Sequence, residues 1–139
     1  MMAIIGFPLL LVSFAIYNIV AFLMPGVSWT QTLREFHLVS NENFSLGTGD
    51  ALVAVSMLLL FLEMVKCSRP AGRTVVDHLL SLLLFAVFLV EFLVVAQAAT
   101  GTFFLLVVLS FVDLIGGFVV AIRSGKGEAP IERERVPVA

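Results

Sequence analysis

Long apolar runs alternate with short polar gaps along the chain. The runs cover about residues 3–24, 48–66, 74–99 and 102–122. Each is near the ~20 residues that a helix needs to cross a hydrocarbon core about 30 Å thick. Helices are the default spanning structure because lipid offers backbone groups no hydrogen-bond partner. The pattern predicts an all-α polytopic membrane protein, with a bundle of four transmembrane helices within residues 1–123.

Two segments lie outside these runs. In the first loop, residues 28–31 match a helix-capping pattern, and Trp29, Leu33 and Phe36 then recur at i, i+4 and i+7. We expect a short helix here, lying in the membrane interface with Trp29 as its anchor. Residues 124–139 mix Gly, Pro, Glu and Arg without periodicity, which predicts a disordered cytoplasmic tail.

Basic residues indicate the orientation. The gap between the second and third runs contains Lys66, Arg69 and Arg73, and Arg123 and Lys126 follow the fourth run. The gap between the third and fourth runs has no charge. Because cytoplasmic loops carry the excess of Lys and Arg, both termini are expected in the cytoplasm. The expected location is the plasma membrane, specifically a bacterial inner membrane.

The composition agrees with this class of protein. Hydrophobic residues make up 60% of the 139 residues and charged residues only 13%, against roughly 25% charged in a typical soluble domain. The net charge is -2 and no basic stripe is present, which argues against a nucleic-acid partner. A single cysteine excludes an intrachain disulfide framework.

Carboxyl groups are the most informative polar residues, because no Lys or Arg lies in the interior of any run. Asp50 and Asp77 fit first-turn positions of helices, where the helix dipole favours an anion. Glu63 can turn toward Lys66 or reach the membrane surface, and we favour this over a buried role. Asp77, Glu63 and the neighbouring His78 are therefore only secondary candidates for a functional site.

Glu91 and Asp113 are harder to explain as edge residues. A charged side chain at the bilayer centre costs ~2.5–3.5 kcal/mol on insertion scales. At 100° per residue, Ser110 and Asp113 share one face of the fourth helix. Similar stripes contain Asp77, Ser81, Phe88 and Glu91 in the third helix, Leu106, Ser110, Asp113 and Gly117 in the fourth, and Ser13 and Tyr17 in the first.

We expect these stripes to meet around one buried polar centre, with Asn18 at the depth of Glu91. Such a centre could bind or relay a proton or small cation, or it could simply fix helix packing. The candidate ligands for a proton or cation are Glu91, Asp113, Asn18, Ser110 and Tyr17. The sequence has no nucleophile–base pair, cofactor motif or metal-ligand spacing, so we expect neither catalysis nor a cofactor or metal.

The leading hypothesis is a proton- or cation-handling channel or transporter component. A single four-helix unit encloses little room for a pore, so a homo-oligomer or a larger membrane-protein complex is expected. The alternative is a non-catalytic accessory or assembly subunit of such a complex.

The layout resembles families of small bacterial four-helix membrane proteins. The small multidrug transporters use a glutamate in their first helix, whereas residues 3–24 contain no acid. A second resemblance, to the phosphate-starvation-inducible group, rests on Glu63 followed by a basic loop. No residue role is carried over from either family.

Overall fold

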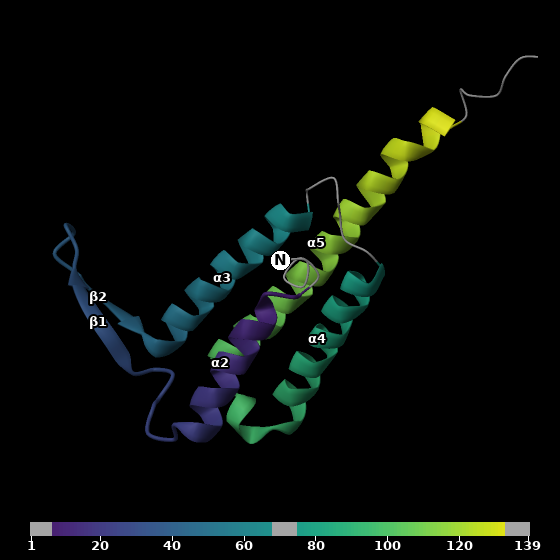
Figure 1. Ribbon diagram of the computed structural model, residues 1–139. Helices are drawn as coiled ribbons and strands as arrows, with labels where there is room; N and C mark the ends of the chain where they lie inside the picture. The colour runs from purple at the N-terminus through teal and green to yellow at the C-terminus, as the bar shows by residue number, and fades with distance from the viewer. Residues whose placement is uncertain (1–6, 68–74, 133–139) are drawn as a thin grey trace, which may run out of the picture.

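The computed structural model describes residues 7–67 and 75–132, which are mostly helical. The four α-helices of this part lie side by side and alternate in direction (Figure 1). A two-stranded antiparallel hairpin connects the first two helices and projects from the bundle. The elements in order are α2 (Leu10–Leu23), β1 (Thr32–His37), β2 (Asn43–Gly47), α3 (Thr48–Cys67), α4 (Val75–Val94), the 3₁₀ turn η1 (Ala96–Ala98) and α5 (Gly101–Glu132).

Three helical segments are long and apolar enough to cross a membrane: Thr48–Lys66, Val75–Val94 and Gly101–Val120. They correspond to the second, third and fourth predicted runs. The third ends earlier than predicted, since residues 96–98 form the 3₁₀ turn. α2 has 14 residues, or about 21 Å at 1.5 Å per residue. Residues 3–6 of the first predicted span lie outside the described residues.

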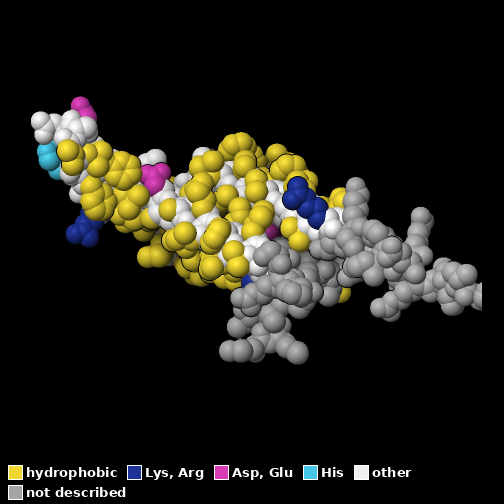
Figure 2. Space-filling view, turned by 90° about the horizontal axis from the view of Figure 1, so that it is seen from above, with side chains coloured by type: hydrophobic (Ala, Val, Ile, Leu, Met, Phe, Trp, Pro, Cys, Tyr) yellow, Lys and Arg dark blue, Asp and Glu magenta, His cyan; other side chains and the backbone are white. Residues whose placement is uncertain are grey.

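The predicted inward stripes are confirmed for most of their members. Ser13, Tyr17, Ser81, Phe88, Leu106, Ser110 and Asp113 are buried, whereas Asp77 and Glu91 are half-buried. Leu10, Leu84, Phe88, Phe103 and Leu106 belong to the buried core. Many other large apolar side chains point outward, and hydrophobic atoms cover most of the helical surface in Figure 2. Soluble monomers rarely expose an apolar surface of this extent, and such a surface is compatible with a membrane location.

α3 and α5 approach each other closely at two glycines. Gly49, in the first turn of α3, lies against the Thr102 hydroxyl in the first turn of α5. Near the other end, Gly116 of α5 lies against the Met64 side chain of α3. Small residues at such positions let helices pack in lipid, where apolar burial gives little drive for association.

The predicted interfacial helix is wrong, because the first loop forms the β-hairpin. Phe36 pairs with Phe44 across the strands, their rings stacked with centroids 6.3 Å apart. Asn41 adopts a left-handed φ of 65° in the loop that joins the strands. A helix this short is marginal on its own. In the hairpin, backbone N–H and C=O groups of this segment form hydrogen bonds with the second strand.

The predicted disorder from residue 124 is also wrong as far as Glu132, because α5 continues to that residue. The prediction rested on composition alone. Adding residues to an existing helix avoids the cost of nucleating a new one, so a segment of unfavourable composition can still continue α5. Residues 133–139 of the predicted tail lie outside the described part of the chain. The longer helix extends well beyond its neighbours in Figure 1.

Replacement of Gly49 by Ala should destabilise the bundle. The added Cβ would meet the Thr102 hydroxyl and lie 3.1 Å from the Trp29 carbonyl oxygen. Overpacking of this kind costs about 1–3 kcal/mol, which thermal unfolding in detergent, followed by circular dichroism, would detect as a lower midpoint. Gly101→Ala is the matched control because that Cβ meets no atom within 4 Å. Equal midpoints for the two variants would contradict the close packing.

Candidate functional site

Asp113 lies in the interior of the bundle, on α5, with only 2% of its surface exposed. Ser81 of α4 donates a hydrogen bond to its Oδ2 at a long distance of 3.4 Å. Ser110, one turn earlier on α5, is equally buried, but its hydroxyl donates to the Val107 carbonyl 2.7 Å away. Asp113 and Ser81 therefore form a polar contact between two helices, while Ser110 bonds within its own helix.

Glu91 lies apart from Asp113, on the side of α4 that faces α2. Asn18 Nδ2 donates to the Phe14 carbonyl at 3.0 Å and lies 3.5 Å from Glu91 Oε2. The other oxygen, Oε1, is buried and has no hydrogen-bond partner among the described residues. A half-open hollow of about 390 Å³ lies beside Glu91 along α4; it is lined by Ala86, Val87, Val90, Glu91, Val94 and Val95.

Tyr17 connects α2 to the turn between α4 and α5. Its hydroxyl donates to the Gln97 carbonyl at 2.8 Å and lies 2.7 Å from the Thr100 hydroxyl oxygen. Thr100 in turn accepts a hydrogen bond from the backbone N–H of Phe103 and so caps the start of α5. The ring of Tyr17 stacks on Trp29 with 4.4 Å between centroids. Tyr17 is thus held by structural contacts on its ring and hydroxyl.

Glu63 is buried, with 4% exposure, which contradicts the expectation that it reaches the surface. Its Oε2 accepts a hydrogen bond from the backbone N–H of Leu9, 2.8 Å away, at the start of α2. A carboxylate is favourable there because the N–H groups at a helix start have no intrahelical partner and the dipole is positive. Lys66 Nζ lies 3.4 Å from the Phe7 carbonyl oxygen just before that helix. The end of α3 therefore holds the start of α2.

Asp77 lies in the first turn of α4, as predicted. Next to it, the ring of His78 packs 5.5 Å from the ring of Phe118. Both His78 ring nitrogens are buried without a hydrogen-bond partner in the described part of the chain. Over the same residues, no group of three His, Cys, Asp or Glu side chains comes together that could hold a metal ion.

The sites of Glu91 and Asp113 lie at different depths, so the expected single polar centre is divided in two. Ser81, which contacts Asp113, precedes Glu91 by ten residues on α4, a rise of about 15 Å. A third polar contact lies between them in depth: the Ser13 and Ser56 hydroxyl oxygens are 2.7 Å apart and buried. On α2, Ser13 precedes Asn18 by five residues, or about 7.5 Å. Asn18 does lie at the depth of Glu91, as expected.

Comparisons with protein-family models, curated proteins and solved structures find no match to this chain. Its function is therefore inferred from the polar contacts inside the bundle.

Two residues of these contacts were not singled out from the sequence. Ser56 is the one polar side chain between Asp50 and Glu63, and that isolation in an apolar run is the signal that could have found it. Thr100 lies in a short uncharged gap, and nothing in the local pattern distinguishes it from an ordinary turn residue.

Removing the Tyr17 hydroxyl with Tyr17→Phe should lower the free energy of unfolding by about 1 kcal/mol, the net value of a typical hydrogen bond. The stacking on Trp29 would remain. A double-mutant cycle with Thr100→Val, measured by unfolding in detergent, would isolate the hydroxyl–hydroxyl contact. Strictly additive losses would show that the two hydroxyls do not interact.

Proposed function

We propose that the chain crosses the membrane four times, with α2 and the residues before it forming the first crossing. Contacts at the start and in the middle of α2 support this. Leu9, at its start, is bonded to Glu63 near the end of α3, and Tyr17 reaches Thr100 just before α5. α2 therefore covers much of the depth of the three longer helices. The basic residues of the second loop and of the segment after the fourth span favour cytoplasmic termini in a plasma membrane.

We further propose that this bundle handles protons or a small cation. The observation that carries the proposal is the series of polar groups at successive depths of a mostly apolar interior. Glu91 with Asn18 lies toward the end bearing the hairpin, and Asp113 with Ser81 lies toward the other end. The Ser13–Ser56 pair lies between these two levels.

The chemistry of each group fits such a role. A carboxyl group can gain or lose a proton, and a hydroxyl can both donate and accept a hydrogen bond. Ser13 and Ser56 therefore place hydroxyls of this kind at the level between Glu91 and Asp113. Carboxylate, amide and hydroxyl oxygens are also the ligands that hard cations prefer. Rows of intramembrane acids are a recurring device in proton and ion pathways.

A homo-oligomer or a larger membrane complex would complete this pathway. One unit of four helices leaves little interior space, because side chains fill the centre of such bundles. Glu91, which faces α2, also lines the open hollow along α4. A neighbouring copy packed against this hollow would enclose Glu91.

Substitution of the two acids tests the proposed function. Purified protein in liposomes should conduct protons or a small cation, and Asp113→Asn or Glu91→Gln should reduce that flux at least tenfold. Neither variant can exchange a proton, although each keeps the shape of the original side chain. Flux would be followed with a pH-sensitive dye and with a potassium or sodium electrode.

Glu42→Gln is the matched control, because Glu42 is an exposed acid in the hairpin loop. It should leave the flux unchanged. Absence of flux from the unmodified protein, or full flux from the Asp113→Asn, Glu91→Gln double variant, would eliminate the proposal.

The hollow beside Glu91 also favours the second candidate function, that of an accessory subunit. A helix of a larger membrane protein could fill the space along Ala86 and Val90. Extraction in a mild detergent followed by native mass spectrometry should then find a different chain in fixed stoichiometry, lost on Ala86→Phe. Recovery of this chain alone, or with copies of itself only, would contradict the accessory role.

A further inference from the structure

The β-hairpin has one polar and one apolar face. Successive residues of a strand point to opposite sides, and directly paired residues of two strands share a side. The pairs Glu35–Ser45 and His37–Asn43 make up the polar face, where His37 Nδ1 and Asn43 Oδ1 lie 2.9 Å apart. The pairs Arg34–Leu46 and Phe36–Phe44 make up the opposite face.

This second face is apolar and uncovered. Phe36 and Phe44 stack on each other, yet each remains more than 40% exposed, and Val39 at the tip is fully exposed. The guanidinium of Arg34 lies 5.8 Å from the centre of the Phe36 ring. An isolated two-stranded hairpin is marginally stable in water, so an exposed apolar face on it implies a further contact.

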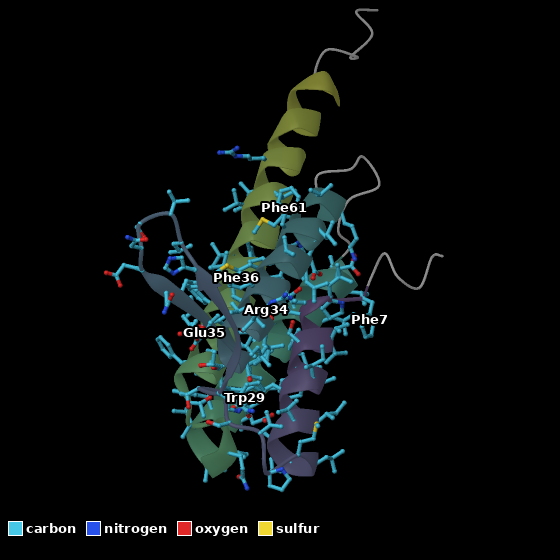
Figure 3. The ribbon with its side chains drawn as sticks, turned by 90° about the vertical axis from the view of Figure 1, so that its left-hand side faces the viewer. Phe7, Trp29, Arg34, Glu35, Phe36 and Phe61 are labelled. Carbon is cyan, nitrogen blue, oxygen red and sulfur yellow. The ribbon has the colours of Figure 1, made fainter. Side chains whose placement is uncertain are left out.

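The direction of the hairpin indicates what that contact is. The hairpin leaves the bundle where α3 begins and projects sideways from the helices, with its tip well clear of them (Figures 1 and 3). In Figure 3, Phe36 lies well away from Trp29, which is at the base of the hairpin. The hydrophobic side chains of the hairpin continue the apolar surface of the helices in Figure 2.

We propose that the hairpin lies on the bilayer and places its apolar face in the phospholipid headgroup region at that end of the bundle. Phe36, Phe44 and the tip residues Leu38 and Val39 would contact the upper acyl chains, and Arg34 would bind lipid phosphate. Three features favour lipid over a protein partner. The apolar face is continuous with the surface of the membrane-spanning helices, the hairpin extends sideways at one end of those helices, where a bilayer surface would lie, and its cation is an arginine, whose guanidinium fits phosphate.

Spin labels on the hairpin test this placement in the full-length protein. Cys67, the only cysteine of the chain, is replaced in Cys67→Ser, and single labels are attached at Val39→Cys or at Glu35→Cys on the polar face. The protein is reconstituted into vesicles of phosphatidylcholine and phosphatidylglycerol. Collisions of the nitroxide with oxygen, which concentrates in lipid, are compared with collisions with a water-soluble nickel complex.

The label at residue 39 should collide several-fold more with oxygen than with nickel, and the label at residue 35 should show the reverse preference. Leu38→Cys offers a second tip position that should repeat the result of residue 39. A tip label that prefers nickel would place the hairpin in water and overturn the proposal. A tip label shielded from both reagents would also overturn it, because that result means that a protein surface, such as a second copy, covers the tip.

Discussion

Hydrocarbon gives a polar group no hydrogen-bond partner, and the arrangement of these helices follows from that constraint. A polar side chain in a span is satisfied inside the bundle or by its own helix, and among the described residues the His78 ring and one oxygen of Glu91 are the exceptions. Ser13 meets Ser56 and Ser81 meets Asp113, so two inward contacts each join a different pair of helices. Because acyl chains are as apolar as Leu, such contacts and the close approach at Gly49 determine which helices are neighbours.

Much of this arrangement could be predicted from the sequence, because it depends on local patterns. Span lengths follow from the distance between polar gaps, and three of the predicted runs coincide with helices that can cross a membrane. The buried stripe containing Ser110 and Asp113 follows from helical periodicity alone. Even the shared depth of Asn18 and Glu91 follows from counting residues from the ends of their runs.

Contacts between distant parts of the chain could not be predicted in this way. Glu63 is bonded to the backbone N–H of Leu9, 54 residues away, and every residue except proline carries such a donor. Likewise, the spacing of Trp29, Leu33 and Phe36 matches a helix by coincidence, since the partner of Phe36 is Phe44 on a second strand. The separation of Glu91 from Asp113 required the pairing of α4 with α5, which fixes the depth of each acid.

The stacking of Tyr17 on Trp29 gives the molecule a built-in optical reporter. The chain contains one tryptophan and one tyrosine, and their rings lie parallel, 4.4 Å apart, where the hairpin joins the bundle. Nearly all of its near-ultraviolet absorption and its indole emission therefore originate at this junction. Any event that shifts the hairpin against α2 would change the colour and intensity of that emission, whereas events at the far end of α3 would leave it nearly constant.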